Sequence, residues 1–541
     1  MNLVKYEKLI VAFLLSIMFI LAVSSMLQKS VTSDEVTHLP AGYSYIKTND
    51  FRMNPEHPPL VKELSGLFLL LINPNIDVGS ESWENTWQWV FGKDLLYNLN
   101  DNTDEILFFG RLPIVLLSLL LGFFVYLFAK KLYGVKAGLF ALLLYVFSPN
   151  ILAHSRFVTT DLGGILFLFL TMFYLYNFLK DYSLKNFLLF SLFFGLAQVA
   201  KFSNIFLVVL VVVVLLVKFN KKIIHAQPFS VIRFFLIFLV LNIFIVNLFY
   251  GFNDLYNNKS KSDFVKDLMP GKIEFIEDTV YNVLRPVPIA GKYIEGLSDV
   301  LQKSKSGHMA YLMGEYNRTG WRHYFIVAFL VKTPISTLIL IVLSLVLFRR
   351  IKHHGFSELF LILPILLYFI VLSLGYINIG LRHILVIYPF IFVFVSKVVN
   401  YKKIKIMIII LSLWYVISSL LIYPHYLAYF NEAIGPDNGH KYLIDSNLDW
   451  GQDLKGLDKW LENNEITEKI KLNYDNKLEA NYRGINYERY NFCEKPTTGL
   501  FAIRINNLVG SAPTLKDCFR WLDEHEPIAK IGYTIWVYDL K

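Results

Sequence analysis

The sequence is poor in charged residues. Asp, Glu, Lys and Arg make up 18% of its 541 residues, whereas a soluble protein carries about 25%. Hydrophobic residues make up 55%. They gather in blocks of about 17–25 residues, the length that crosses a hydrocarbon core of about 30 Å. This composition excludes a soluble globular protein and predicts a polytopic membrane protein.

Other features are also missing. The chain has no internal repeat and no low-complexity tract. A secondary transporter, the alternative from another class of protein, usually shows internal repeats and interrupted helices near the membrane midplane. No small-residue cleavage site follows the first apolar segment, so we expect a retained helix rather than a signal peptide. Cys493 and Cys518 are the only cysteines; a disulfide and two unlinked thiols both remain open.

The apolar blocks predict about eleven membrane-spanning helices. We place them at residues 9–27, 106–129, 137–153, 161–179, 186–201, 203–217, 230–249, 332–348, 357–374, 382–397 and 404–422. Basic residues then fall on one side, which the positive-inside rule assigns to the cytoplasm. They are Lys5, Lys8, Lys130, Lys131, Lys136, Lys180, Lys185, Lys218, Lys221, Lys222, Arg349, Arg350, Lys352, Lys402, Lys403 and Lys405.

This topology predicts a multi-pass protein of the plasma membrane with a cytoplasmic N-terminus. Residues 28–105, 250–331 and 423–541 are expected on the outer side. Lysines of the cytoplasmic loops explain much of the net charge of +9. The charge therefore requires no nucleic-acid partner.

The first outer loop concentrates polar groups beside the membrane. Ser33 is expected to cap a short helix that runs to about Lys47. An exposed cap would explain Asp34 and Glu35 without any chemistry; a catalytic acid pair is the alternative. Prolines hold the stretch around His57 extended. The apolar segment 60–72 is too short to span and predicts a helix lying on the membrane, which would set Lys62 at headgroup height.

Further ionisable residues fall in other outer turns. Arg156 and Asp161 flank the outer end of the fourth span, where a structural Arg156–Asp161 pair is the alternative to a functional role. Lys201 could also snorkel to the surface. Lys332 precedes Pro334, so the true span is expected to begin near residue 333, with an interfacial helix before it. The remaining pair is Arg382 and His383.

The tail has the composition of a soluble domain. Residues 440–446, 469–474, 500–505 and 531–538 are expected as strands, and residues 452–461 and 515–522 as helices. Residues 423–541 therefore predict a small α/β domain. The run Asp445, Asp449 and Asp453 lacks the spacing and the glycine of an EF-hand. A structural or acceptor-facing turn fits it better than a calcium loop.

These residues resemble a known family. Asp34-Glu35, followed by His57-Pro58-Pro59-Leu60 and Lys62, is similar to the opening loop of the dolichyl-phosphate-mannose–protein O-mannosyltransferases, glycosyltransferase family 39 of the GT-C fold. Ser155-Arg156-Phe157 with Asp161 resembles the second signature of that family, at the start of the fourth span. Later stretches resemble prokaryotic, phospholipid-carrier-dependent members. They are Gly320-Trp321 to Pro334, Gly380 to His383, Tyr429 to Glu432 and Asp445 to Leu454.

The resemblance implies a GT-C membrane domain over residues 1–422 and an extracytoplasmic α/β domain over residues 423–541. It implies that a sugar, mannose or another hexose, passes from a polyprenyl-phosphate donor to an acceptor hydroxyl with inversion. Asp34 would be the general base, Glu35 its partner or a positioning residue, and Asp161 a residue that orients this site, binds the acceptor or holds a metal. The donor phosphate would be bound by His57, Lys62, Arg156, Lys201, Lys332, Arg382 and His383.

The acceptor stays open. Eukaryotic family members carry a β-trefoil MIR domain in a large lumenal loop, and residues 250–331 are too short for one. The family also includes the lipid A aminoarabinose transferases. Protein, lipid and glycan acceptors are therefore all compatible with the resemblance. No cofactor is expected to be required, and the sequence gives no support for a divalent cation.

Overall fold

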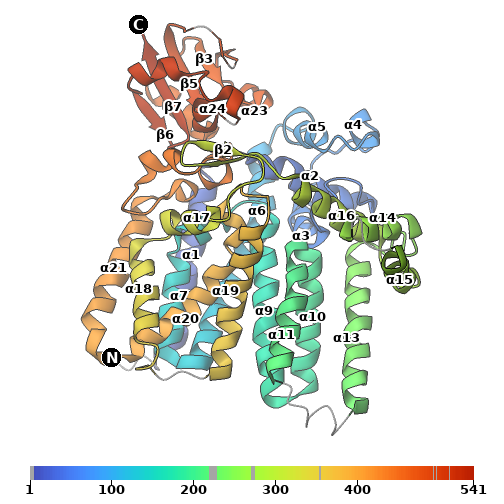
Figure 1. Ribbon diagram of the computed structural model, residues 1–541. Coiled ribbons are helices and arrows are strands. Elements are labelled where there is room, and N and C mark those ends of the chain that lie inside the picture. Colours follow the sequence, from blue (N-terminus) through green and yellow to red (C-terminus); the bar gives the residue numbers. More distant parts are fainter. Residues whose placement is uncertain are drawn as a thin grey trace.

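The computed structural model describes residues 5–218, 228–269, 274–351, 355–491, 493–494, 496–510 and 512–541. A bundle of apolar helices forms the lower part of the molecule, short helices lie across its upper end, and an α/β domain sits on top (Figure 1). The N-terminus lies at the lower end of the bundle and the C-terminus in the upper domain. The predicted basic residues Lys221, Lys222 and Lys352 lie outside the described residues.

Six helices of the described residues are long and apolar enough to cross a membrane. They are α1 (Glu7–Met26), α6 (Thr103–Tyr133), α9 (Thr160–Asp181), α13 (Pro228–Phe249), α19 (Gly355–Leu374) and α21 (Lys405–Leu421). Shorter apolar helices are α7 (Val135–Val146), α10 (Leu184–Ala200), α11 (Leu207–Lys218) and α20 (Ile387–Ser396). With the bent pair described next, they occupy the positions of the eleven predicted spans. The number of membrane crossings remains a prediction.

The bent pair consists of α17 (Tyr324–Lys332) and α18 (Ile335–Val346), whose axes differ by 110°. Thr333 and Pro334 form the break. Pro334 precedes the first residue of α18, and its missing N–H removes a donor that would continue α17. The predicted break near residue 333 is confirmed, and α17 crosses the upper end of the bundle (Figure 1). That the membrane span begins there remains a prediction.

The first outer loop folds into helices that cover the bundle. The two largest are α2 (Ser33–Thr48) and α3 (Pro59–Leu69). Their backbones touch at glycines: a Cβ on Gly42 would lie 1.9 Å from the Lys62 carbonyl oxygen, and one on Gly66 would lie 2.5 Å from the Gly42 carbonyl carbon. Any side chain at either position would push the two helices apart. Beyond them lie α4 (Glu81–Glu84), α5 (Gln88–Lys93) and a π-helical turn (Asp94–Asn98).

The start of α2 differs by one residue from the prediction. Thr32, not Ser33, is the N-cap, in a capping box with Glu35. The Ser33 backbone N–H instead donates to the Trp450 carbonyl oxygen at 2.9 Å. This bond joins the first outer loop to a segment more than four hundred residues later in the chain.

The second outer segment contains α14 (Asn258–Leu268), α15 (Glu274–Leu284) and α16 (Gly291–Ser306). It ends in an antiparallel hairpin of β1 (Ala310–Leu312) and β2 (Glu315–Asn317). The Tyr316 hydroxyl donates to the carbonyl oxygens of Val509 and Gly510, at 2.9 and 2.8 Å. The hairpin is therefore fixed to the upper domain.

The upper domain is built on a mixed five-stranded sheet of order β4-β3-β5-β7-β6. The strands are β3 (Ile470–Asn473), β4 (Tyr487–Arg489), β5 (Gly499–Arg504), β6 (Ala529–Ile531) and β7 (Ile535–Leu540). The other regular elements are α22 (Leu454–Asn463), α23 (Lys477–Tyr482) and α24 (Ile505–Val509). Leucines of α22 share one apolar core with Leu472, Ala502 and Val537. These three sit side by side across neighbouring strands.

Two predicted elements of the tail are wrong. In place of the strand at residues 440–446 there are two 3-10 turns, Pro436–Lys441 and Asp445–Asn447. In place of the helix at residues 515–522 there are the 3-10 turns Pro513–Leu515 and Arg520–Glu524. Cys493 and Cys518 are joined by a disulfide. Such a bond suits an oxidising compartment outside the cytoplasm.

The stretch from residue 423 to 453 packs with the bundle rather than with the sheet. Tyr426, Phe430, Leu448 and Trp450 are buried in the same apolar core as the membrane helices. The sheet and its own core begin with α22. The predicted boundary between residues 422 and 423 remains a prediction, and this stretch links the two parts.

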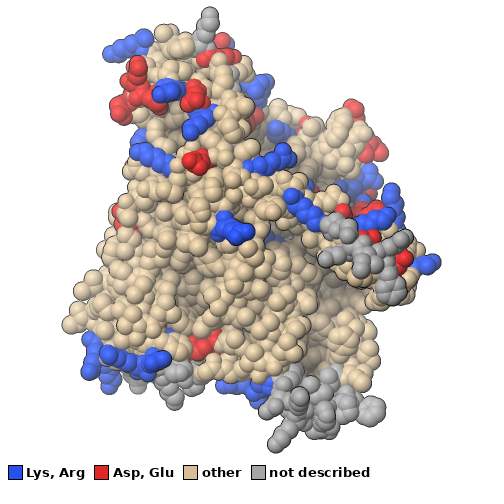
Figure 2. Space-filling model, in the orientation of Figure 1, with Lys and Arg blue, Asp and Glu red and all other residues tan. Residues whose placement is uncertain are grey.

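Charge is distributed unevenly over the visible surface. In Figure 2, Lys and Arg gather along the lower edge, an almost uncharged band lies above them, and both signs mix at the upper end. Contacts place several predicted basic residues at the lower end: Lys130 pairs with Glu7, and Lys131 donates to Asn177. The gathering matches the predicted one-sidedness, while the side of the membrane remains a prediction.

Candidate active site

The candidate site is centred on an ion pair between Asp34 and Arg382. Asp34 lies in the first turn of α2, and Arg382 in a 3-10 turn (Leu381–Ile384) that leads into α20. An Nη1–H of Arg382 donates to Oδ2 of Asp34. Both side chains are largely buried, at 18% and 13% exposure. None of the described residues donates to the other oxygen of Asp34.

A second ion pair lies beside the first. Lys201, at the end of α10, pairs with Asp161 in the first turn of α9. Nη1 of Arg382 is 4.0 Å from the second oxygen of Asp161. Asp34, Arg382, Asp161 and Lys201 thus form a row of alternating charges. The structure brings these four predicted residues together.

Histidines line this row. The rings of His38 and His57 meet edge to face, with centroids 4.6 Å apart. Burial, followed by the positive charges of neighbours that include Lys62 and Arg382, holds the pKa of His57 well below its usual range. Burial also lowers the pKa of His38. At neutral pH both rings are neutral, and each offers one donor and one acceptor.

Several buried polar atoms at this site have no hydrogen-bond partner among the described residues. They are Nε of Arg382, Nε2 of His383, Nδ1 of His154 and Oδ2 of Asp161. A buried polar group without a partner costs roughly 1–3 kcal/mol. Such atoms are normally satisfied by protein, water, an ion or a ligand, so their gathering makes this region the candidate site.

The stretch of residues 449–453 supports the row from below. Its Trp450 ring lies under the Arg382 guanidinium, 4.5 Å from ring centroid to Cζ. The same ring meets His154 edge to face at 5.9 Å. Asp449 is held by Arg504, with Nη2 of Arg504 2.9 Å from Oδ1. The prediction of a structural turn fits these contacts, and no three His, Cys, Asp or Glu side chains of the described residues form a metal-binding group.

Glu35 does not face the row. It is fully buried and accepts two hydrogen bonds of 2.7 Å from Arg111 on α6. The backbone N–H groups of Thr32 and Val158 also donate to it, at 2.9 and 3.0 Å. These partners make Glu35 the residue that fixes the start of α2, and with it Asp34. This arrangement fits the predicted positioning role, and a direct catalytic role of Glu35 stays a prediction.

Lys62 and Lys332 are also engaged elsewhere. The Lys62 ammonium is buried and donates to the Tyr45 hydroxyl and to two oxygens of Asn54, at 2.8, 2.8 and 3.2 Å. Lys332 donates to the carbonyl oxygens of Leu427 and Asn447. Neither ammonium lies exposed at headgroup height, as the sequence had predicted for Lys62. Both hold the loops around the site.

Arg156 belongs to a neighbouring group. It donates to the Pro424 carbonyl oxygen at 2.8 Å, and not to Asp161, so the alternative of an Arg156–Asp161 pair is wrong. Its Nε and Nη2 lack partners among the described residues. The group also contains Lys29, which pairs with Asp453. Arg156 is therefore a second buried cation with free donors.

Three residues that organise the site escaped sequence reasoning. Arg111 and Lys29 sit at the ends of apolar segments, where a basic residue reads as an ordinary flank. Trp450 reads as a core aromatic. A buried carboxylate such as that of Glu35 requires a nearby cation. This requirement was the signal in the sequence that could have pointed to Arg111.

Comparisons with known proteins agree with this fold. Residues 101–250 match the family model described as dolichyl-phosphate-mannose-protein mannosyltransferase. No curated protein sequence matches the chain significantly. The matched residues include Asp161 and Lys201, and they do not reach Asp34 or Arg382.

The structure is similar to that of ArnT from Cupriavidus metallidurans bound to undecaprenyl phosphate. The TM-score is 0.50 at 11% sequence identity, and the match covers 99% of this chain and 98% of that one. The same protein in the apo state gives a TM-score of 0.37 at 12% identity, with the same coverage of 99% and 98%. The bound form and the family model together show that this chain is a membrane protein with the GT-C glycosyltransferase fold.

Proposed function

We propose that the chain is a membrane glycosyltransferase that moves a sugar from a polyprenyl-phosphate donor to an extracytoplasmic acceptor hydroxyl. The sugar is mannose or another hexose. The observation that carries the proposal is the carboxylate of Asp34, held through one oxygen by Arg382 with the other oxygen unused by the described residues. The fold and the family match of residues 101–250 support the same class of reaction.

Asp34 acts as the general base in this proposal. The acceptor hydroxyl must lose its proton as it attacks the anomeric carbon, and a carboxylate within hydrogen-bond reach accepts it. Arg382 and the Glu35–Arg111 pair fix the orientation of α2 and of the carboxylate. Attack by a single acceptor, with no covalent intermediate on the protein, inverts the anomeric configuration.

Buried cations stabilise the leaving phosphate. Arg382 and Arg156 keep donor nitrogens without a partner among the described residues, and the neutral His383 keeps its Nε2 without one. A phosphate oxygen satisfies such a donor. Negative charge develops on the phosphate as the glycosidic bond breaks, so donors fixed in advance lower the barrier. The guanidinium of Arg382 lies between the carboxylates of Asp34 and Asp161, which keep it in place, and Lys201 in turn pairs with Asp161.

The purified full chain in lipid vesicles tests the proposal. Radiolabelled mannose and glucose, each on a polyprenyl phosphate, are supplied as donors together with membranes from which acceptors are drawn. We expect the labelled sugar of one of the two donors to appear in a product whose anomeric configuration is opposite to that of the donor. Retained configuration, or turnover that does not depend on the polyprenyl phosphate, would contradict the proposal.

A further inference from the structure

A small cavity of about 120 Å³ is lined in part by Asp445, which interacts electrostatically with Arg382 and Asp34 of the row of charges. Polar groups line it from five separate segments: His308, Tyr311, Tyr324, Asn378, Asp445 and Asn506. His308 is exposed, whereas Tyr324 and Asn378 are buried. The cavity therefore runs from the outer surface inward.

One pair of turns connects the wall of the cavity with the Asp34–Arg382 pair. The Ser446 hydroxyl donates to the Ile379 carbonyl oxygen at 2.8 Å, and the Leu381 N–H donates to Oδ1 of Asn447 at 2.8 Å. Ile379 and Asp445 line the cavity. Arg382 follows Leu381 directly in the sequence and donates a hydrogen bond to Asp34. The inner end of the cavity is thus adjacent to the proposed base.

Two lining residues are prepared for a ligand. Asn378 is fully buried; its Oδ1 accepts the Trp321 N–H at 2.7 Å, while its Nδ2 has no partner among the described residues. Asp445 has a backbone φ of +59°, unusual for a residue with a side chain. Asn506 accepts its N–H at 3.0 Å and holds it there. Strained residues of this kind gather at binding sites.

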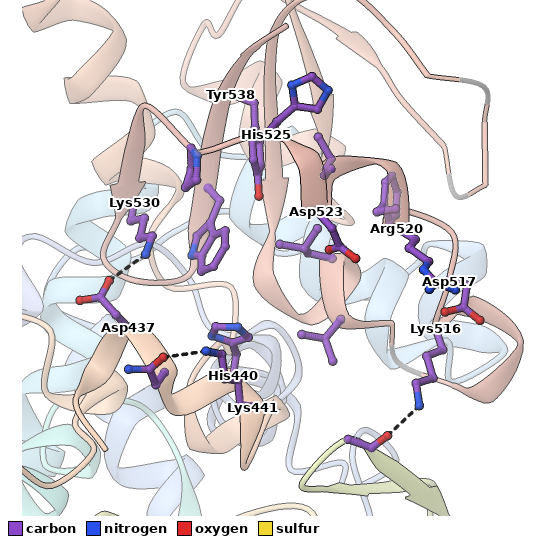
Figure 3. Close-up of a pocket in the computed structure, with 18 of the residues that line it drawn as sticks. Asp437, His440, Lys441, Lys516, Asp517, Arg520, Asp523, His525, Lys530 and Tyr538 are labelled. Carbon is purple, nitrogen blue, oxygen red and sulfur yellow. Dashed lines mark hydrogen bonds and ion pairs between the residues drawn. The ribbon is translucent and has the colours of Figure 1, made fainter. Parts of the chain in front are cut away.

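A wider cavity of about 520 Å³ shares Tyr311 as a wall. It lies between the upper domain and the turn of residues 436–441 (Figure 3). On one side of this cavity Lys530 forms an ion pair with Asp437 at 3.1 Å. On the other side the Lys516 ammonium donates to the Gly314 carbonyl oxygen of the hairpin. Trp536 lies on its wall, with His440 against the ring at 5.1 Å.

We infer that the small cavity binds the hydroxyl-bearing end of a carbohydrate acceptor, with Asn378 and Asp445 as its acceptor-binding residues. The wider cavity holds the sugar units that follow. Amide, carboxylate and phenol groups offer closely spaced donors and acceptors that match the hydroxyls of a sugar ring. Aromatic walls with a few placed polar groups are typical of small-molecule sites. The inference rests on the proposed function and names its acceptor class.

Thiol labelling tests the route, because the chain has two cysteines and both are in the disulfide. His308→Cys places a single reactive thiol at the mouth of the small cavity. Asp539→Cys, exposed on β7 away from both cavities, is the matched control. Each full-length variant is reacted with a bulky methanethiosulfonate reagent. Transfer from the labelled donor to acceptors in native membranes is then measured beside release of the sugar to water.

We expect modification at position 308 to abolish transfer to acceptors while release of sugar to water continues. Modification at position 539 should change neither rate. Asn378→Ala should lower the ratio of transfer to release about tenfold, since a hydrogen bond to a buried group is worth about 1–3 kcal/mol. Asn464→Ala, on the exposed end of α22, should leave the ratio unchanged.

The product identifies the acceptor class. Label that survives protease and is removed by glycan cleavage supports the inference; label that protease converts to small peptides overturns it. Unchanged transfer after full modification of position 308 overturns it as well. If the unmodified chain neither transfers nor releases the sugar, the proposed function itself fails, and that outcome is distinct from the others.

Discussion

Arg382 donates directly to Asp34 across 348 positions of sequence. The bond joins the first turn of α2 to the turn that leads into α20, and Trp450 packs under the guanidinium from a third segment. Three distant parts of the chain therefore meet at one carboxylate. The proposals above depend on this meeting point.

Arg382→Lys keeps the positive charge and removes the planar guanidinium group with its several N–H donors. A lysine cannot hold Asp34 and also offer Nε to a phosphate. We expect kcat to fall about 10²-fold or more, in the range found when one stabilising donor is lost. Lys303→Arg, on the exposed end of α16, is the control for a surface basic residue. Wild-type kcat in Arg382→Lys would show that Arg382 does not act on the donor.

Glu35→Gln separates a structural role from a catalytic one. The change leaves Arg111 as a buried cation without its counter-charge, which costs about 3–5 kcal/mol. We expect a clear drop in the Tm of the detergent-purified chain, whereas Glu105→Gln, at an exposed position on α6, should not alter it. The remaining folded protein should keep most of its activity. Lost activity at an unchanged Tm would restore Glu35 as a catalytic residue.

The lowered pKa of Lys62 predicts that the free energy of unfolding increases with pH. Burial lowers the pKa of Lys62 to about 7, whereas the unfolded chain has a lysine pKa of about 10.4. Between these values the unfolded state binds the extra proton, so the free energy of unfolding increases as pH rises from about 7 to 10. Lys62→Met removes this contribution.

The measurement is the pH dependence of Tm for the wild type and Lys62→Met. Loss of the three hydrogen bonds lowers the Tm of the variant at every pH. The change of Tm with pH, rather than its absolute value, therefore tests the prediction. We expect a smaller slope in Lys62→Met between pH 7.5 and 10. Equal slopes would show that the Lys62 ammonium keeps its proton in the folded protein.

We expect removal of the Cys493–Cys518 disulfide to lower the stability of the upper domain locally. It closes a loop with a sequence separation of 25 residues, and loops of this size contribute about 3–4 kcal/mol. The pair Cys493→Ser and Cys518→Ser should increase hydrogen exchange in β4, β5 and β7. Exchange in the membrane helices should stay the same. Uniform exchange across the chain would contradict a local role.

The helices of this fold could be read from the sequence because their signals are local. Runs of apolar residues set the positions of the spans, and Pro334 marked the break before α18. The capping box at Thr32 and Glu35 was also visible, although Ser33 drew the cap one residue too far. Residues 440–446 were misread as a strand, whereas the structure has short 3-10 turns at Pro436–Lys441 and Asp445–Asn447.

The site could be predicted only as a set of candidates. Asp34, Asp161, Lys201 and Arg382 met as expected, because their outer turns share one end of the bundle. Lys62 turned out to be buried and bonded to Asn54, and Glu35 turned to Arg111. Which partner a charged side chain finds depends on packing between distant helices, and no local pattern carries that information.

The most direct test of the account is the rate of sugar transfer by Asp34→Asn in vesicles with labelled polyprenyl-phosphate sugar. The amide keeps the size of the side chain and cannot take the acceptor proton, so we predict a loss of about 10²–10⁴-fold in kcat. Asp539→Asn, exposed on β7, serves as the control. Transfer near the wild-type rate, by an Asp34→Asn protein with an unchanged Tm, would contradict the central claim.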